Sequence, residues 1–284
     1  MFKRLLGIEP QVEEDGSMRP SKLGLMLATS PISNYEPVAY EPYQGKRSKI
    51  IVLLTEEKNM AMKNGSYFST GNHPVETFVP MLHFREAGFD FDIVTPTGKP
   101  AVFEEWAMPH QDTEVMSLYN DMKSQFDAPA ALPNYLTARD KLAASCAGVF
   151  IPGGHGAMIG LPDDPNVGEL LRWAHTNGLY TISLCHGPGA FLATALKGQP
   201  FLYEGYRMAV FPDSVDQKTP MIGYLPGAMP WELSRKLSDY GVKVMNERAD
   251  DSCCLDRQLI TGASPAAADK LGRLASKRLL ENLA

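Results

Sequence analysis

The sequence predicts an α/β fold in which helices cover both faces of a mostly parallel sheet. The first reason is a continuous apolar and β-branched run at residues 50–54, which is typical of a strand buried on both faces of a parallel sheet. The second is that, from residue 49 onwards, such runs alternate with stretches of helical character. Strands and helices that alternate in this way build a sheet covered by helices on both sides.

Each expected element follows from its local pattern. The expected strands lie at residues 50–54, 89–95, 148–151, 180–184, 207–211, 242–245 and 258–261. The expected helices lie at residues 74–87, 165–177, 188–197, 231–240 and 264–282. Gly88 and Gly178 follow the first two of these helices, where glycine commonly ends a helix.

Two segments stand outside this alternation. Residues 1–47 are rich in Pro, Glu and Ser, and we expect an N-terminal arm or wrap over the core that is partly ordered at best. Residues 99–146 interrupt the alternation, and we expect a helical insertion or small subdomain beside the main sheet. The catalytic domain would then span residues 48–284, which contain no internal repeat and no low-complexity tract.

Composition excludes several classes of protein. The chain has 284 residues, 44% of them hydrophobic and 21% charged, which is ordinary for a globular protein. Its net charge is −6 and no stretch is dominated by Lys and Arg, so we expect no dedicated nucleic-acid surface. No apolar run approaches the ~20 residues of a membrane span. An acidic stretch at residues 9–15 argues against a signal peptide, and four scattered cysteines argue against a disulfide scaffold, so we expect a cytoplasmic protein.

The strongest motif is the expected strand at residues 180–184, which runs directly into Cys185 and His186. A helix is expected within a few residues, so the turn must be sharp, and Gly187 and Gly189 supply the small residues it needs. Such a turn lifts the cysteine side chain over the sheet edge where ligands of open α/β sheets bind. The helix N-terminus would favour the thiolate, so we predict a nucleophile with a lowered pKa. The alternative is a buried small hydrophobe, the usual role of a lone cysteine.

A nucleophilic thiol needs a base, and the base needs a third group to orient it. His186 is the obvious base or proton shuttle. Asp213 and Asp216 follow the next expected strand, and either could orient the imidazole. Because Asp213 could equally cap a helix after Pro212, spacing alone does not choose between them.

Two further motifs place polar groups near the same sheet edge. Gly153 and Gly154 follow the strand at residues 148–151, and their exposed backbone N–H groups could stabilise an oxyanion formed by attack of Cys185. A simple tight turn is the plainer interpretation of this glycine pair. Glu76 stands in the first turn of an expected helix, where it either complements the helix dipole or acts as a general acid or base.

Taken in order, these motifs resemble those of a known family. The sequence is similar to the HchA-type proteins, the heat-shock chaperone and glutathione-independent glyoxalase (or deglycase) branch of the PfpI-like cysteine hydrolase superfamily. The resemblance runs from about residue 31 to residue 280. It is most specific at residues 69–77, 103–110, 149–162, 182–193, 211–227 and 259–265.

The resemblance implies a flavodoxin-like fold with a smaller added domain, and a homodimer. It also implies a Cys-His-Asp triad with an adjacent acid and an oxyanion site. The residues at the matching positions are Cys185, His186 and Asp216 for the triad, Glu76 for the acid, and Gly153 and Gly154 for the oxyanion site. The match therefore prefers Asp216 to Asp213.

The expectation for metals is negative. Some members of the family bind a metal through two histidines and a glutamate, and the matching positions here are Arg85, Asp90 and Met122. Arginine is no ligand at neutral pH, and a methionine thioether suits soft metals only. His83 shares a helical face with Glu76, but seven residues separate them by roughly 10 Å along the axis. We therefore expect no metal and no other cofactor.

The resemblance also implies a function. We expect Cys185 to convert methylglyoxal or glyoxal into a 2-hydroxy acid without glutathione, or to remove the early adducts of these aldehydes from amines and thiols. The first alternative is a holding chaperone, whose partners would be unfolded proteins bound to an exposed apolar surface. The second alternative is a cysteine peptidase or amidase, which a narrow pocket would exclude.

Overall fold

A seven-stranded sheet forms the centre of the molecule, with strand order β12-β13-β9-β8-β3-β6-β7. The computed structural model describes residues 6–283, apart from the side chain of Asp140. The strands are β3 (Lys49–Leu53), β6 (Asp90–Thr95), β7 (Ala130–Ala131), β8 (Cys146–Ile151), β9 (Tyr180–Leu184), β12 (Cys253–Asp256) and β13 (Leu259–Gly262). All neighbours run parallel except β12, which is antiparallel to β13. The predicted α/β fold with a mostly parallel sheet is therefore confirmed.

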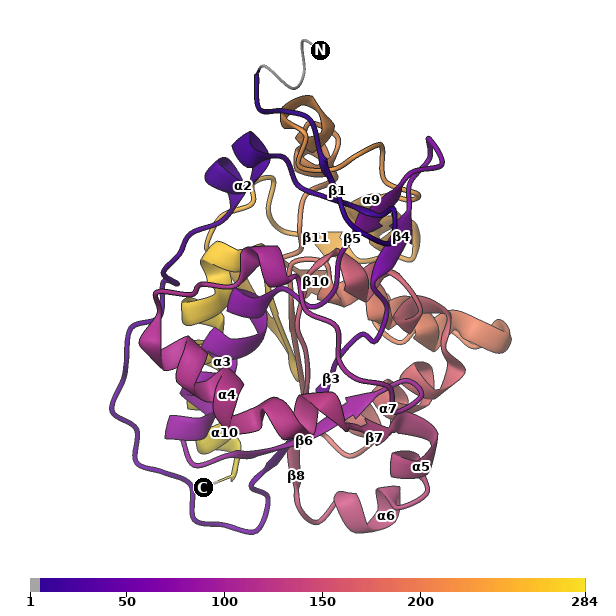
Figure 1. Cartoon of the computed structure of the whole chain (residues 1–284). Coiled ribbons are helices and arrows are strands. Elements are labelled where there is room, and N and C mark those ends of the chain that lie inside the picture. The colour runs from indigo at the N-terminus through magenta and orange to yellow at the C-terminus, as the bar shows by residue number, and fades with distance from the viewer. Residues whose placement is uncertain (1–5, 284) are drawn as a thin grey trace.

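Helices cover both faces of this sheet (Figure 1). Strand β3 shows why both faces need cover, because Ile51 and Leu53 enter one hydrophobic core while Ile50 and Val52 enter the other. All four side chains are fully buried. The two layers are α3 (Pro74–Glu86), α4 (Thr113–Asp127) and α10 (Ala268–Leu283) on one face, and α5 (Leu132–Leu136), α7 (Pro165–Thr176) and the 3₁₀ helix η4 (Gly187–Gly198) on the other.

Two expected strands do not join the main sheet. Within residues 207–211 and 242–245, only β10 (Arg207–Met208) and β11 (Lys243–Val244) are extended, and they pair with each other in a separate two-stranded sheet. After β10 the backbone bonds to a side chain of β13 and does not pair with that strand, since Ala209 N–H donates to Thr261 Oγ1 at 2.8 Å. The alternation of strands and helices therefore predicted both extended segments but wrongly assigned them to the main sheet. It also missed β12, whose hairpin with β13 turns at Arg257 with φ 56°.

The N-terminal arm contains regular elements that the sequence did not predict. They are β1 (Gln11–Val12), β2 (Met18–Arg19) and α2 (Lys22–Ala28). Ser21 caps α2 by accepting from Gly24 N–H at 2.9 Å, and Ser21 N–H donates to Gly223 O at 2.8 Å. The two strands form a four-stranded sheet with β5 (Tyr67–Ser69) and β4 (Asn59–Ala61). The first five residues of the expected arm lie outside the described residues.

The stretch at residues 99–146 is helical for much of its length but returns to the main sheet. It holds η1 (Glu105–Ala107), α4, β7, α5 and α6 (Arg139–Leu142), and β7 pairs with β6. The division into an arm, a main domain and an insertion stays a prediction. The remaining elements are η2 (His155–Met158), η3 (Leu161–Asp163), α8 (Asp213–Asp216), η5 (Thr219–Ile222), α9 (Leu233–Asp239) and η6 (Pro265–Ala267). Between residues 6 and 283 no helix has the length and apolar character needed to cross a membrane.

Candidate active site

Cys185 lies at the apex of a sharp turn between β9 and η4. Its φ is 57°, in the left-handed region, where a non-glycine residue costs about 1–3 kcal/mol. Two backbone hydrogen bonds hold it there. Its N–H donates to Gly262 O at 2.8 Å, and its carbonyl accepts from Phe211 N–H at 3.0 Å. The turn projects the thiol from the carboxyl-terminal edge of the sheet, where the sequence predicted it.

His186 connects the thiol to a buried carboxylate. Its Nδ1 lies 3.2 Å from Cys185 Sγ, and its Nε2 lies 2.8 Å from Asp216 Oδ2. Burial alone would raise the pKa of Asp216, but the imidazoles of His186 and His155 outweigh it and hold this pKa below its usual range. Asp216 therefore accepts, so His186 Nε2 carries a proton and Nδ1 is free to accept one from the thiol. This is the order of nucleophile, base and orienting acid in a catalytic triad.

Asp213, the other aspartate that the sequence left open, has a different place. Its Oδ1 accepts from Ser234 N–H at 2.9 Å, and its Oδ2 accepts from Arg235 N–H at 2.8 Å. Both donors belong to the first turn of α9, where backbone N–H groups have no partner within the helix. The carboxylate of Asp213 thus caps α9, and Asp216 is the one that contacts His186.

Glu76 lies in the first turn of α3 and faces the thiol. It is fully buried, and neither carboxyl oxygen has a hydrogen-bond partner of ordinary geometry among residues 6–283. Burial raises the pKa of Glu76 to about 8, while the thiol of Cys185 and the amides of Gly154 and Gly153 lie close enough to oppose part of that rise. A carboxyl group with a pKa near neutrality can both give and take a proton at the reacting centre.

The lowered pKa predicted for Cys185 is contradicted by the structure. Burial and the negative charge of Glu76 raise the thiol pKa well above its usual value. The prediction had rested on the helix N-terminus alone. Two adjacent buried anions would repel each other strongly, so the thiol and the carboxyl group share one negative charge. Cys185 can ionise when Glu76 keeps its proton.

Gly153 and Gly154 bring backbone amides to the same point. A Cβ at Gly153 would collide with Glu76 Oε2 and come within 2.7 Å of Cys185 Cβ, so the close approach requires glycine. Gly154 has φ 99°, which glycine adopts readily, and its amide faces both Glu76 and Cys185. Amides in this position can stabilise negative charge on a substrate oxygen beside the thiol.

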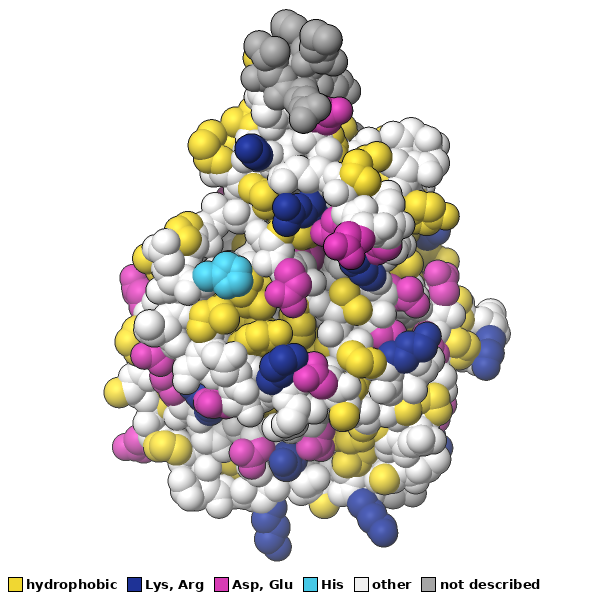
Figure 2. Space-filling view, in the orientation of Figure 1, with side chains coloured by type: hydrophobic (Ala, Val, Ile, Leu, Met, Phe, Trp, Pro, Cys, Tyr) yellow, Lys and Arg dark blue, Asp and Glu magenta, His cyan; other side chains and the backbone are white. Residues whose placement is uncertain are grey.

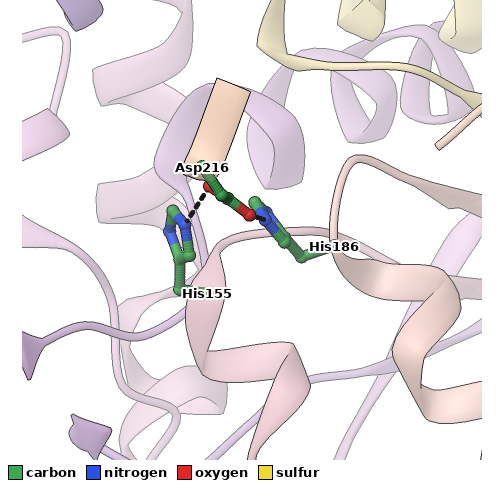
Figure 3. Close-up of side chains that lie close together, drawn as sticks. All are labelled: His155, His186 and Asp216. Carbon is green, nitrogen blue, oxygen red and sulfur yellow. Dashed lines mark hydrogen bonds and ion pairs between the residues drawn. The ribbon is translucent and has the colours of Figure 1, made fainter. Parts of the chain in front are cut away.

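Two residues of the site, His155 and Glu104, were not predicted from the sequence. His155 Nε2 lies 3.0 Å from Asp216 Oδ1, so Asp216 bridges two imidazoles (Figure 3). Glu104 lies on the other side of this ring, with 4.0 Å between its Oε1 and His155 Nδ1. His155 follows the glycine pair at the end of β8, and that sheet-edge position is a signal for it. Glu104 follows no strand of the main sheet and has no comparable signal.

A single group of side chains in residues 6–283 is dense enough to hold a metal ion, namely His155, His186 and Asp216. The hydrogen bonds from both imidazoles to the carboxylate account for this closeness without an ion. The three side chains therefore form one hydrogen-bonded group around Asp216.

The positions that match the metal ligands of some family members do not fit a metal. Arg85 Nη1 lies 3.4 Å from Asp121 Oδ2, and Lys49 Nζ lies 3.9 Å from Asp90 Oδ2. Met122 is buried in the hydrophobic core under α3. A guanidinium that pairs with a carboxylate supplies no lone pair to an ion.

The reactive groups line one cavity of about 440 Å³. This volume lies in the range of about 300–1,000 Å³ that small-molecule sites occupy. Leu27 and Ala28 of α2 contribute to its wall, and Leu27 is 61% exposed, so the N-terminal arm reaches the rim. The polar lining residues are His73, Glu76, Glu104, His155, Cys185, His186, Asp216, Thr219, Tyr224 and Ser264.

Curated proteins resemble the chain along nearly its whole length. It is 42% identical over 274 residues to the Protein/nucleic acid deglycase HchA of Escherichia coli O7:K1 (strain IAI39 / ExPEC), which covers 95% of each chain. The same identity and coverage hold for the Protein/nucleic acid deglycase 1 of Escherichia coli (strain K12).

Solved structures share the fold at low sequence identity. The Francisella tularensis Rapid Encystment Protein 24 KDa has a TM-score of 0.69 at 16% identity, covering 82% of this chain and 99% of that one. The glyoxalase III (Orf 19.251) from Candida albicans has a TM-score of 0.63 at 18% identity, covering 84% of this chain and 98% of that one. The DJ-1/PfpI family matches residues 67–200, which include Glu76, Gly153, Gly154 and Cys185. The chain belongs to the HchA-type deglycases of the DJ-1/PfpI family.

Proposed function

We propose that this protein converts small α-oxoaldehydes such as methylglyoxal into 2-hydroxy acids without glutathione, with Cys185 as the nucleophile. The observation that carries the proposal is that one thiol contacts an imidazole on one side and a fully buried, unpaired carboxyl group on the other. An amide-cleaving triad needs only the imidazole. The added acid suits a reaction that moves protons within a small substrate.

The reaction proceeds through a covalent intermediate. The thiolate of Cys185 adds to the aldehyde carbon, and the former carbonyl oxygen takes a proton to give a hemithioacetal. Glu76 and His186 then move a proton from this carbon to the adjacent one through an enediolate, which the amides of Gly153 and Gly154 stabilise. The product is a thioester, and water hydrolyses it to the 2-hydroxy acid and the free thiol. Oxidation of one carbon and reduction of its neighbour balance within the substrate.

The same thiol suits early adducts of these aldehydes with amines and thiols. The related Escherichia coli proteins are described as protein/nucleic acid deglycases. In such an adduct the former aldehyde carbon bears a hydroxyl group and the amine or thiol. Departure of the amine or thiol with a proton restores the aldehyde, to which the thiolate of Cys185 then adds. A cavity of about 440 Å³ has room for one adducted side chain. A cysteine peptidase would need an open groove for a chain on both sides of the scissile bond.

The test of this function is D-lactate formation from methylglyoxal in the absence of glutathione. We expect wild-type protein to form D-lactate and Cys185→Ser to form none. Cys253→Ser is the matched control, because that thiol is half-buried and lies outside the cavity, and it should keep wild-type activity. Lactate formation by Cys185→Ser near the wild-type rate would overturn the proposal.

One observation favours a holding chaperone as a second function. Apolar side chains are exposed on the arm and on η5, close to the cavity, and hydrophobic side chains spread over the upper part of Figure 2, where α2 and β1 lie. They include Val12, Met26, Leu27, Ile32 and Met221, each more than half exposed. Cys185→Ser should still suppress aggregation of an unfolded client if this surface acts alone. The double change Met26→Lys with Met221→Lys should weaken suppression and leave lactate formation intact.

We also propose, from the family resemblance, a homodimer in the cytoplasm. Light scattering coupled to size-exclusion chromatography measures the mass of the assembly directly, and a mass of one chain at micromolar concentration would contradict the homodimer.

A further inference from the structure

We propose that Glu104 is a second catalytic acid. It protonates the carbonyl oxygen on the carbon adjacent to the one that is bound to Cys185. The inference rests on the proposed oxoaldehyde reaction and deepens it. That reaction moves one proton between carbons and another between oxygens. Glu76 and His186 lie beside the thiol and move the proton between the two carbons. Glu104 lines the same cavity from a different element and has no role in the triad.

The contacts of Glu104 place its proton on one particular atom. Its Oε1 accepts from Thr70 Oγ1 at 2.7 Å and from His155 N–H at 3.4 Å. Its Oε2 is buried and has no partner among the described residues. The gap of 4.0 Å between Oε1 and His155 Nδ1 is too long for a hydrogen bond, so no proton is shared between these atoms. A protonated Glu104 therefore carries its hydrogen on Oε2, the atom left for a cavity occupant.

The surroundings of Glu104 keep a large share of it protonated at neutral pH. It is 1% exposed, and burial raises its pKa to about 7 against the opposing effects of His155 and the Thr70 hydroxyl. The titratable groups that face it are His155 on η2, Glu76 on α3 and Tyr224 after η5. The pKa of Tyr224 is raised well above its usual value by burial, so this phenol stays neutral while Glu104 titrates.

The proton balance of the step is complete. As the base removes hydrogen from the carbon bound to sulfur, electrons move to the neighbouring carbonyl and Glu104 Oε2 gives its proton to that oxygen. The enediol then takes a proton on the second carbon. The hydroxyl on the first carbon returns its proton to Glu104 as the thioester carbonyl forms. Glu104 ends each cycle as it began, and no other reactant is needed.

The first test replaces the acid with an isosteric amide. Glu104→Gln keeps the oxygen that accepts from Thr70 but has no acidic proton to give. We expect kcat for lactate formation to fall by about 10²-fold or more, with KM changed little. The alkaline decline of kcat should lose the contribution of Glu104 near pH 7 and keep that of Glu76 near pH 8. Alkylation of Cys185 by iodoacetamide should keep its wild-type rate, because the thiol has its own partners. Glu105→Gln, an exposed acid one residue away, is the matched control and should behave as wild type.

A second variant keeps the acid and moves its titration. Thr70→Val removes the hydroxyl that stabilises the ionised form of Glu104, so the pKa of Glu104 should rise. The alkaline decline of kcat should then move to higher pH without being lost, a shift that a purely structural role of Glu104 would not produce.

The outcomes separate this inference from the function on which it rests. If wild-type protein forms no lactate, both fail. If wild-type protein is active while Glu104→Gln keeps the wild-type kcat and alkaline decline, the role of Glu104 alone is overturned. A Glu104→Gln protein that loses both turnover and Cys185 alkylation also contradicts the inference, because the residue would then support the site as a whole.

Discussion

At the scale of one residue, the burial of Glu76 lowers the stability of the folded chain but gives its carboxyl group a pKa that suits proton transfer. The ordinary pKa of its carboxyl group is 4.5, and burial raises it to about 8 in the folded chain. Between these pH values the unfolded chain binds fewer protons than the folded one, so the free energy of unfolding falls as pH rises. Glu76→Gln removes this titration. The variant should therefore gain stability over wild type as pH rises, by on the order of 3 kcal/mol at pH 8, while its turnover falls.

Urea unfolding of both proteins at pH 4.5 and pH 8 measures this difference. The two free energies of unfolding should be similar at the lower pH and separate at the higher one. Glu105→Gln removes an exposed carboxyl group and should show no such separation. A difference between Glu76→Gln and wild type that is the same at both pH values would mean that Glu76 is already ionised in the folded state.

The sequence indicated some residues of the site but not others, for a physical reason. Cys185 and His186 are adjacent, and the strand and glycines that shape their turn lie in the same short stretch. The lowered thiol pKa was wrong because it was argued from that stretch alone, whereas the burial of the thiol and its contact with Glu76 depend on other elements. His155 comes to lie between Glu104 and Asp216 only after three separate segments have folded together. No local pattern encodes such a meeting.

At the scale of elements, α9 depends on an aspartate close to the site. The carboxylate of Asp213 caps this seven-residue helix through Ser234 and Arg235. Asp213→Ala should cost about 1 kcal/mol of stability and leave kcat within about threefold of wild type, because a cap acts on its helix. Asp216→Asn should lower kcat by roughly 10²–10⁴-fold, because His186 loses the acceptor that fixes its tautomer.

Steady-state kinetics and urea unfolding on the two variants decide between these roles. The pair is matched, since both changes remove one carboxylate from the same short helix, α8. A large loss of turnover in Asp213→Ala with stability unchanged would reverse the assignment.

The sequence predicted strand positions well where a strand is buried on both faces of the sheet. Strands β3, β8 and β9, which are almost wholly buried, lie within a few residues of their predicted positions. Strand β7 was not predicted, because two alanines carry no strand pattern. Strand β12 has only half-buried residues and lies at the edge of the sheet, so its pattern is weak. Strands β10 and β11 pair for two residues outside the main sheet. Their place depends on partners distant in sequence, which periodicity does not report.

At the scale of the whole molecule, the segment before β3, residues 30–47, packs along one helical layer of the sheet (Figure 1) and hydrogen-bonds to both α3 and α10. Tyr40 OH lies 3.0 Å from Nδ1 of the buried His83 on α3, and His83 Nε2 lies 2.9 Å from Asp269 on α10. Burial lowers the pKa of His83, so the neutral ring donates to Asp269 and accepts from Tyr40. The prolines of this segment predicted its extended path, but the contacts that order it depend on the assembled helices.

Removing the tyrosine hydroxyl tests these hydrogen bonds. Tyr40→Phe leaves a buried ring nitrogen without its donor, which should cost about 1–3 kcal/mol of stability and hasten proteolysis within residues 30–47. Tyr43→Phe is the matched control, because its hydroxyl makes no hydrogen bond to any residue between 6 and 283 and its ring stacks on Phe89. Unfolding by urea and timed digestion with protease should separate the two variants. Equal stability would show that the hydroxyl of Tyr40 contributes nothing to the stability of the folded chain.

The reach of α2 to the cavity separates two properties along the chain. The residues around the thiol, Cys185, His186, Glu76 and Glu104, all follow residue 70. Leu27 and Ala28, which form part of the cavity wall, precede the first strand of the main sheet. Exchange of residues 22–28 between relatives would therefore alter which aldehydes and adducts enter and leave the bond-making groups untouched. In such a chain, selection can change which substrates enter the cavity without changing the residues around the thiol, because the two depend on different segments.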